Sequence, residues 1–310
     1  MIILVTGFNG SNNSFIPSHM VQHLKDAGHE VDGWEYDYDY EKAFYGWTWS
    51  ADYKKYVHAT PKPVSNFVDW EYPKTIDKYD LVIHLGAISD TTETDVGMVM
   101  DQNFDFSVWL LGQCQLHNIP LHYASSASVY GQGTDFKETA DMHPQSPYAW
   151  SKCMFDRVVI NNVDKFRAPV LGFRYFNVYG IGEEHKGNQM SPVSKFEKQM
   201  AEDSEIQLFE NSENYKRDFV YVEDICKMHE KLLDCKESGV YNVGTGEALS
   251  FRELAECMIE NTGSSIFEIP MPEELKHQYQ EYTCADLTKL NEIVDMEWTN
   301  VKDYIKSIYG

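Results

Sequence analysis

The sequence predicts an α/β protein built on a doubly wound parallel sheet, with a smaller and less regular α/β lobe toward the C-terminus. Short apolar runs typical of buried strands alternate with helical patterns through the first half of the chain. This order brings successive strands together in parallel, with helices on both faces of the sheet. The 310 residues, 43% of them hydrophobic, suffice for one large domain or two closely joined lobes.

The first half supplies the elements of this sheet in order. Residues 2–5 form an apolar run that predicts a buried strand, and Ile16, Met20, Leu24 and Ala27 recur with the spacing of a helix after it. Further strands are expected at residues 30–35, 81–85, 121–124 and 170–174, with helices around residues 103–117 and from 148 to about 163. Residues 36–72 are aromatic and irregular, and their pattern is the least informative in the chain.

The second half is less regular. Residues 218–222 and 239–246 are typical of strand ends, and residues 251–261 predict a helix because Leu254, Ala255 and Met258 share one face. The sequence contains no internal repeat and no flexible linker. We therefore expect two lobes that share segments of the chain.

The overall charge limits the possible partners. The chain carries 26 basic and 49 acidic residues, a formal net charge of −23. Nucleic acids and anionic membrane surfaces bind basic faces, so we expect neither as a partner. No apolar run approaches the ~20 residues of a transmembrane helix. The six cysteines show no C-x-x-C spacing, which is typical of reduced thiols in a cytoplasmic protein.

A glycine-containing turn, Gly7-Phe-Asn-Gly10, follows the first strand and precedes the first helix. In that context glycines permit a tight turn and the close approach of a dinucleotide pyrophosphate, as in a Rossmann-type fold. The third glycine is missing, because Pro17 stands in its place behind an insertion at residues 11–14. Proline is tolerated in a first helical turn, so the helix is still expected. A plain strand–turn–helix is the alternative.

Glu35 ends the second predicted strand, with Asp37 two residues later. A carboxylate at that point can bond the adenosine ribose hydroxyls and so favours NAD over NADP. Either residue can fill this role, and an ordinary solvated Glu is the alternative.

Tyr148 and Lys152 stand four residues apart on a predicted helix, so they share a face. A tyrosine with a pKa of about 10 is a poor base at neutral pH. The Lys152 charge is expected to lower that pKa and favour the phenolate. An exposed Tyr and a solvated Lys are the alternative explanation of this spacing.

His19 and His23 also share a helix face, as zinc ligands do. No acidic residue lies between them and no third ligand is evident. We therefore predict a surface of the first helix and no metal site.

Longer motifs resemble those of one family. They are Thr6-Gly7…Gly10, Leu85-Gly-Ala-Ile-Ser89, Tyr123-Ala-Ser-Ser-Ala-Ser-Val-Tyr-Gly131, Tyr148…Lys152, Arg174-Tyr-Phe-Asn-Val-Tyr-Gly180, Arg217-Asp-Phe-Val-Tyr-Val-Glu-Asp224 and Asn242-Val-Gly-Thr-Gly246. They resemble the extended short-chain dehydrogenase/reductase family of nucleotide-sugar epimerases and dehydratases. Its ADP-heptose 6-epimerase branch is resembled by Ser89-Asp-Thr-Thr-Glu-Thr-Asp95, His185-Lys186-Gly187, Leu208-Phe-Glu-Asn-Ser-Glu-Asn-Tyr-Lys-Arg217 and Tyr279-Gln-Glu-Tyr-Thr-Cys-Ala-Asp286.

The resemblance implies an epimerase with tightly bound NAD or NADP. The sugar C6 hydroxyl would be oxidised to a ketone, and hydride would return to the opposite face. Ser126, Tyr148, Lys152 and Lys186 would be catalytic: Ser126 bonds the substrate oxygen, Tyr148 exchanges its proton, Lys152 bonds the nicotinamide ribose, and Lys186 is the second base. A solvated loop lysine is the alternative for Lys186.

The resemblance also implies the binding residues. For the cofactor they are Gly7, Gly10, Phe15, Ile16, Glu35, Leu85, Gly86, Ala87, Ser89, Asn103, Lys152 and Val178. For a nucleotide-diphosphate sugar like ADP-heptose they are Asn177, Phe209, Glu210, Asn211, Ser212, Arg217 and Tyr279. The cofactor domain would span 1–177 plus about 219–246, and the sugar-nucleotide lobe about 178–218 and 247–310. A homo-oligomer is expected.

Other functions stay open. A 4,6-dehydratase usually has an Asp-Glu pair after the serine, where Ala127 and Ser128 stand here. A non-catalytic sugar-nucleotide-binding protein would not need Ser126, Tyr148 and Lys152. A 4-epimerase is the nearest alternative within the fold. Phe196 replaces a His that the family uses near the substrate, which predicts a drifted substrate preference.

Overall fold

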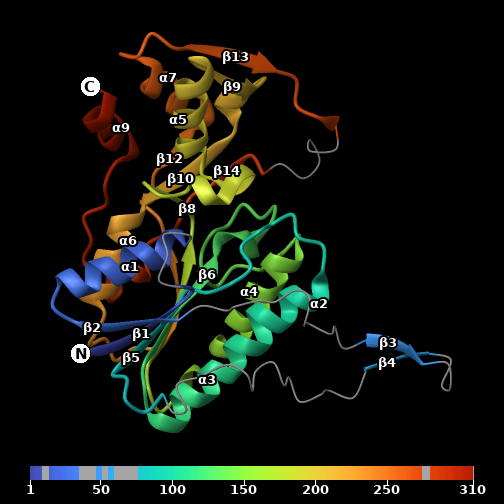
Figure 1. Cartoon of the computed structure of the whole chain (residues 1–310), viewed down its shortest axis with the longest axis vertical. Helices are drawn as coiled ribbons and strands as arrows, with labels where there is room; N and C mark the ends of the chain where they lie inside the picture. The colour runs from blue at the N-terminus through green and yellow to red at the C-terminus, as the bar shows by residue number, and fades with distance from the viewer. Residues whose placement is uncertain (9–13, 35–46, 51–54, 59–75, 274–279, 310) are drawn as a thin grey trace.

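The structure is a computed structural model that describes residues 1–8, 14–34, 47–50, 55–58, 76–273 and 280–309. Its larger lobe contains a six-stranded sheet with the order β11-β7-β6-β5-β1-β2 (Figure 1). The strands are β1 (Ile2–Thr6), β2 (Glu30–Trp34), β5 (Leu81–His84), β6 (Leu121–Ser126), β7 (Val170–Tyr175) and β11 (Gly239–Val243). All neighbouring strands pair in parallel, and the predicted fold class is confirmed.

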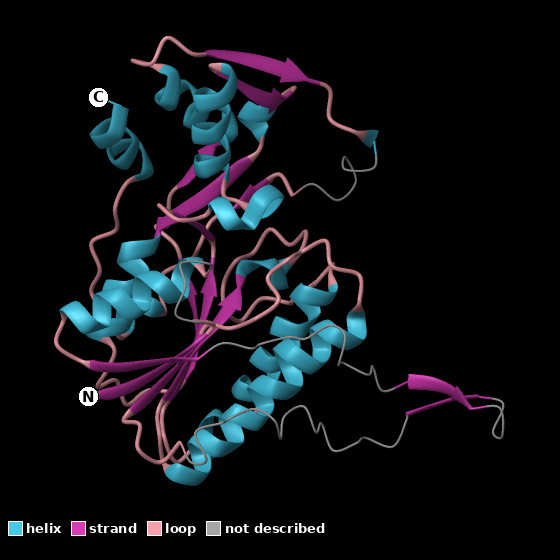
Figure 2. Ribbon diagram, in the orientation of Figure 1, coloured by secondary structure: helices cyan, strands magenta, loops and turns pink. Residues whose placement is uncertain are grey.

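Helices cover both faces of this sheet, as Figure 2 shows. α1 (Phe15–Asp26) and α6 (Val222–Lys231) lie on one face. α3 (Phe106–His117) and α4 (Pro147–Ile160) lie on the other. α2 (Val96–Val99) and a π-helical turn (Met100–Asp105) lead into α3.

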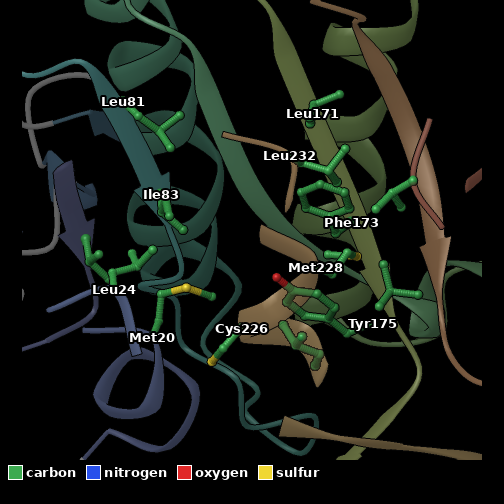
Figure 3. Packing of buried hydrophobic residues seen from close by; sticks show 14 of the residues in the cluster. Met20, Leu24, Leu81, Ile83, Leu171, Phe173, Tyr175, Cys226, Met228 and Leu232 are labelled. Carbon is green, nitrogen blue, oxygen red and sulfur yellow. The ribbon is translucent and has the colours of Figure 1, made fainter. Parts of the chain in front are cut away.

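Two apolar cores hold the helices to the sheet. Because side chains alternate along a strand, β1 sends Ile3 and Val5 into the core beneath α1 and α6, and Leu4 into the core beneath α3 and α4. Figure 3 shows the first core, where Met20 and Leu24 of α1 pack close to the sheet. Burial of such side chains contributes roughly 1.5–3 kcal/mol each.

The switch point of the sheet lies at β1. β2 pairs with one edge of β1, and β5 pairs with the other. The chain leaves β1 and β5 toward opposite faces of the sheet, which opens a crevice beyond the carboxyl ends of these two strands. Doubly wound sheets bind their ligands in such a crevice. Gly7 follows β1 and Leu85 follows β5, so both motifs lie at this crevice.

The smaller lobe combines short sheets with helices (Figure 1). β10 (Lys216–Tyr221) pairs with β8 (Asn177–Tyr179), β12 (Ala248–Ser250) and β14 (Tyr282–Thr283), and β9 (Glu205–Phe209) pairs with β13 (Ser265–Ile269). Its helices are α5 (Pro192–Asp203), α7 (Phe251–Ile259) and α9 (Val301–Tyr309). One apolar core joins these elements and includes Phe196, Ile206, Phe219, Leu254 and Ile305.

Short elements complete the chain. Single 3₁₀ turns occupy Ala127–Tyr130, Val163–Lys165, Glu184–Gln189, Ser212–Asn214 and Leu290–Glu292. β3 (Trp47–Ser50) pairs antiparallel with β4 (Lys55–His58). This hairpin lies within residues 36–72, where the sequence pattern was least informative.

The predicted elements differ from the structure in two places. α1 begins at Phe15 with Pro17 in its first turn, as expected, but the helix predicted from residue 103 starts as the π-helical turn. Residues 218–222 end a strand as predicted, yet that strand, β10, lies outside the six-stranded sheet. The division into two lobes stays our proposal, with β10 assigned to the smaller lobe.

Candidate active site

A cleft of about 610 Å³ lies beyond the carboxyl ends of the parallel strands, with residues of both lobes in its walls. Most of the predicted cofactor and catalytic residues line it. They are Gly7, Phe15, Ile16, Leu85, Gly86, Ala87, Ser89, Ser126, Tyr148, Lys152, Val178 and Lys186, together with the predicted substrate residue Asn177. The structure thus brings together motifs that lie up to 179 residues apart in the sequence (7 to 186).

Gly7 and Gly86 cross closely at the base of the cleft. A Cβ on Gly7 would lie 2.8 Å from both the Cα and the N of Gly86, and Gly7 has a φ of +88°. The Pro17 ring would lie 3.1 Å from the same Cβ. Pro17 therefore packs helix α1 onto this turn, where the fingerprint would have its third glycine. Two strand ends without side chains leave room for a pyrophosphate, so the residues fit a dinucleotide.

Buried polar side chains hold these strand ends. His84 at the end of β5 bonds Thr6 Oγ1 of β1 through Nδ1 at 2.7 Å and Ser107 Oγ of α3 through Nε2 at 2.8 Å. Burial, with a smaller effect of the Lys152 charge, lowers the pKa of His84 to about 3. A neutral imidazole thus ties β1, β5 and α3 together under the cleft.

Asn103 was expected to bind the cofactor, but it is not among the residues that line the cleft. Its side chain is buried. Its Oδ1 accepts the Ile88 backbone N–H at 2.8 Å, and its Nδ2 donates to the Ile88 carbonyl at 2.9 Å. Asn103 therefore fixes the loop that carries Gly86, Ala87 and Ser89, so its contribution to the cofactor site is indirect.

Ser126 ends β6, and Tyr148 and Lys152 occupy the first turns of α4. The Lys152 Nζ donates to the Ala124 carbonyl at 2.8 Å and lies 5.8 Å from the centre of the Tyr148 ring. Burial raises the pKa of Tyr148, while a hydrogen bond with Ser126 acts in the opposite direction. The net shift of the Tyr148 pKa is therefore upward, opposite to the direction that we expected from the Lys152 charge, and desolvation is its largest cause.

Burial also lowers the pKa of Lys152 to about 8, and the charge of Asp156 acts against this decrease. Asp156 lies one further turn along α4 and forms a fully buried ion pair with Arg174, with Nε 2.8 Å from Oδ2. Tyr123 donates to the other Asp156 oxygen at 2.9 Å. The Asp156 carboxylate, one helical turn from Lys152, is thus fully hydrogen-bonded. Removing either partner of its ion pair with Arg174 would leave a buried charge unpaired.

Lys186 reaches the cleft from the 3₁₀ turn Glu184–Gln189 in the smaller lobe. Its Nζ lies 3.0 Å from Glu183 Oε2 and 4.2 Å from the centre of the Phe15 ring. The predicted second base is therefore a partly buried, paired cation, and the solvated-lysine alternative does not describe it.

A second pocket of about 250 Å³ adjoins the cleft, because Pro192 lines both. Its walls are mostly apolar and aromatic: Phe196, Leu208, Phe209, Tyr215, Phe251 and Ile269, with Lys195, Gln199, Gln207 and Ser212 as polar groups. The predicted residues Phe209 and Ser212 belong to it. Ser212 Oγ is buried and has no hydrogen-bond partner among the described residues.

The other predicted substrate residues lie differently. Glu210 and Asn211 form the exposed turn before Ser212 and do not line the pocket. The Arg217 guanidinium lies over the Phe251 ring at 5.3 Å, and its Nη1 donates to the Lys216 carbonyl at 2.9 Å. Arg217 is thus beside the pocket wall. Gly10, Glu35, Asp37 and Tyr279 lie outside the described residues.

Sequence reasoning missed several residues that line these cavities. They include Ser125, Tyr175, Glu183 and Gln189 in the cleft and Lys195 in the second pocket. Tyr175 belongs to the quoted motif that begins at Arg174, so its position there was the available signal. For Glu183 and Lys195 the sequence offered no signal, since both stand among other charged residues of an acidic chain.

His19 and His23 contact the neighbouring helix. His19 Nδ1 lies 2.5 Å from Glu223 Oε1, and His23 Nε2 lies 2.7 Å from Glu230 Oε2. Within the described ranges, no three His, Cys, Asp or Glu side chains are grouped as metal ligands would be. The two histidines join α1 to α6.

The model of the NAD dependent epimerase/dehydratase family matches residues 3–244. The chain belongs to this family. An ADP-L-glycero-D-manno-heptose-6-epimerase from Alkalilimnicola ehrlichii is 42% identical over 243 residues, which cover 74% of this chain and 76% of that protein. The predicted enzyme class, an epimerase that uses a nicotinamide dinucleotide and acts on a nucleotide sugar, is confirmed.

Solved structures share the fold over nearly the whole chain. The ADP-L-glycero-D-manno-heptose-6-epimerase of Helicobacter pylori superposes with a TM-score of 0.76 at 25% identity, covering 99% of this chain and 94% of that one. A UDP-N-acetylglucosamine 4-epimerase from Methanobrevibacter ruminantium, solved with UDP-N-acetylmuramic acid, has a TM-score of 0.76 at 20% identity and covers 98% and 95%.

Proposed function

We propose that this enzyme epimerises C6 of an ADP-glycero-manno-heptose. One observation carries the proposal: Ser126, Tyr148 and Lys152 of the larger lobe line the same cleft as Lys186 of the smaller lobe. Inversion at one carbon needs a proton donor or acceptor for each orientation of the substrate oxygen. The 42% identity to a heptose 6-epimerase supports the choice of sugar.

The cofactor half of the cleft suits the dinucleotide. Gly7, Gly86 and the start of α1 would hold the pyrophosphate, and Lys152 and Val178 would contact the nicotinamide end. A bound nicotinamide dinucleotide accepts hydride from the sugar carbon and returns it. We propose that it stays bound through the cycle, because no external redox partner is then needed.

The protein side chains handle the proton. Tyr148 takes the proton of the sugar hydroxyl as hydride leaves its carbon, and Ser126 holds the same oxygen. The resulting ketone then receives hydride on its opposite face while its oxygen gains a proton. Lys186 donates that proton, since Lys186 lines the cleft from the other lobe. The cycle closes when Tyr148 releases its proton to water and Lys186 takes one up.

The second pocket suits the nucleotide end of the substrate. Aromatic side chains can stack on a base, and the unpaired Ser212 hydroxyl can bond its edge. Lys195 lines the pocket and forms no ion pair with any residue that the structure describes, while Arg217 lies beside it. In a chain of net charge −23, two cations at this point favour a diphosphate.

One experiment tests this function. The purified protein is denatured, the released nucleotide is identified, and ADP-heptose epimers are followed by NMR with UDP-glucose as the 4-epimerase alternative. We expect a released nicotinamide dinucleotide and interconversion of the heptose epimers. Turnover of UDP-glucose without any change in ADP-heptose would overturn the proposed sugar.

We propose NAD over NADP on the sequence position of Glu35 alone, since that residue lies outside the described ranges. A 2′-phosphate beside Glu35 would meet a like charge, and no basic residue occurs from Glu35 until Lys42. We expect NAD to bind at least as tightly as NADP. A titration in which NADP binds more than about tenfold tighter, about 1.4 kcal/mol, would contradict this.

We propose a homo-oligomer that uses the outer faces of α3 and α4. Large apolar side chains are exposed there: Val108, Trp109 and Leu116 on α3, and Trp150 and Met154 on α4. Such a patch marks an interaction surface. Light scattering should report more than one chain, and Leu116→Glu combined with Trp150→Glu should shift the mass toward the monomer.

We propose a reducing, cytoplasmic location. All six cysteines are free thiols, and Cys114, Cys153 and Cys226 are buried. No helix in the described ranges is long and apolar enough to span a membrane.

A further inference from the structure

Glu183 is a buried acid whose hydrogen bonds connect two parts of the smaller lobe. It directly precedes the 3₁₀ turn of Lys186 and is 1% exposed. Oε2 accepts the Lys186 ammonium at 3.0 Å and the Ser191 backbone N–H at 2.8 Å. Oε1 accepts the hydroxyls of Ser191 at 2.7 Å and Ser194 at 2.9 Å. A buried carboxylate is costly unless it is satisfied, and four donors satisfy this one.

The partners of Glu183 belong to two structural elements, the 3₁₀ turn of Lys186 and helix α5 with its N-cap. Lys186 belongs to the cleft. Ser191 is the N-cap of α5 and accepts the Ser194 N–H at 3.3 Å. The same helix presents Lys195, Phe196 and Gln199 to the second pocket. One carboxylate therefore bonds both the predicted second base and the start of the helix that forms the nucleotide pocket.

Lys186 has few other constraints on its position. Gly187, the next residue, adopts a φ of +53°, and Lys186 Nζ also contacts the face of Phe15. A lysine side chain is long and flexible, so the ion pair with a fixed acid restricts where its ammonium can lie. The neighbouring Glu184 is exposed and makes no hydrogen bond of this kind to any residue that the structure describes, which makes it a matched comparison.

We propose that Glu183 is a positioning residue. It fixes the Lys186 ammonium relative to helix α5, which lines the second pocket. When the nucleotide is bound in that pocket, the sugar oxygen therefore lies beside a proton donor. This rests on the proposed function, because it gives Lys186 a role in the second proton transfer. Glu183 itself gains and loses no proton in the cycle. Its effect on catalysis passes entirely through Lys186.

The test compares Glu183→Gln with Glu184→Gln in the full-length enzyme. Glutamine keeps the size of the side chain but replaces one acceptor oxygen with an NH₂ group, which cannot accept from the ammonium or the serine hydroxyls. We expect Glu183→Gln to lower kcat for epimerisation about ten- to hundredfold, with KM for the sugar nucleotide within about threefold. Glu184→Gln should match the unaltered enzyme.

A second measurement separates positioning from mere structural support. Reduced nicotinamide formed on adding substrate reports the first proton and hydride transfer, which depends on Tyr148 and not on Lys186. We expect Glu183→Gln to retain this signal while epimer formation falls. Equal loss of both signals would mean general damage to the site and would overturn the proposal, as would an unchanged kcat.

Lys186→Ala distinguishes this inference from the proposed function. If Lys186→Ala epimerises at the normal rate, the second-base role fails whatever Glu183 does. If Lys186→Ala is slow and Glu183→Gln is normal, only the positioning role is wrong. Should Glu183→Gln not fold, Ser194→Ala removes one donor alone, and we expect a severalfold fall in kcat with the reduced-nicotinamide signal retained; an unaltered kcat there would overturn the proposal.

Discussion

The two walls of the cleft are built in different ways. On the larger lobe, Gly7, Gly86 and Ser126 come directly after or at the ends of parallel strands, and strand pairing fixes their spacing. On the smaller lobe, Lys186 lies in a 3₁₀ turn, and Ser212 of the adjoining second pocket lies in another. The backbone hydrogen bonds between paired strands position many residues of a sheet at once, whereas the position of a residue in a turn depends on individual side-chain contacts. Loops on a rigid scaffold are where enzymes vary their substrates.

The comparison predicts where substitutions act on rate and where they act on binding. Substitutions on the wall formed by the larger lobe, the sheet-built wall, should lower the rate of the reaction and leave nucleotide binding unchanged. Changes in the smaller lobe should divide into two kinds, because we propose that Lys186 lies beside the reacting carbon and that Lys195 of α5, in the second pocket, lies beside the nucleotide.

The largest effect is expected from Tyr148→Phe. This change removes only the hydroxyl that exchanges the substrate proton, so turnover should fall on the order of 10³–10⁴. The aromatic ring remains, so the melting temperature and the amount of bound nucleotide should not change. Steady-state assays and nucleotide release check both. A variant with a near-normal rate would show that Tyr148 is not the acid–base group.

Lys186→Ala is expected to lower epimerisation by roughly 10²–10³, within the range of general acid–base catalysis. Binding of the sugar nucleotide should change by less than about tenfold, because we propose that the nucleotide binds in the second pocket. Calorimetric titration beside the NMR assay measures both quantities. An epimerisation rate equal to that of the unaltered enzyme would favour a single Tyr148 that serves both faces.

The sequence predicted the sheet-built wall better than the turn-built one. A glycine after a buried strand and two residues four apart on a helix are local patterns, and Gly7, Tyr148 and Lys152 lie where those patterns predict. The pKa of Tyr148 was predicted in the wrong direction, because desolvation depends on residues packed around the ring and not on the helix that carries it.

The turn-built wall, which is the smaller-lobe side of the cleft with Lys186, depends on side-chain contacts that no local sequence pattern predicts. Glu183 stands beside Glu184 in an acidic chain, and only the fold buries the first and exposes the second. Lys195 lines a pocket whose walls also include Phe251 of α7 and Ile269 of β13, which are distant in sequence. The partners of His19 and His23 lie 204 and 207 residues away, so their joining of α1 to α6 could not be predicted either.

A smaller effect is expected from Lys195→Gln in the second pocket. Loss of a half-buried cation that meets the diphosphate should raise KM by about tenfold, equivalent to about 1.4 kcal/mol, with little change in kcat. Lys198→Gln is the matched control, because Lys198 lies on the same helix but is exposed and pairs with Glu202 at 3.9 Å. If both variants raise KM equally, the effect is one of general charge, and Lys195 does not contact the substrate.

The smallest effect at neutral pH is expected from the titration of Lys152. Burial lowers its pKa to about 8, so the ammonium is mostly charged at pH 7 and loses its proton as the pH rises through that value. Tyr148 has a raised pKa. We propose that the Lys152 charge helps Tyr148 to give up its proton, because a nearby positive charge favours the phenolate. The value of kcat/KM should therefore fall by up to about tenfold per pH unit on the alkaline side. Lys152→Met should lack this limb as well as most of its activity. For the unaltered enzyme, kcat/KM could instead stay constant until about two pH units above that pKa. This result would show that the Lys152 charge is not needed for proton transfer by Tyr148.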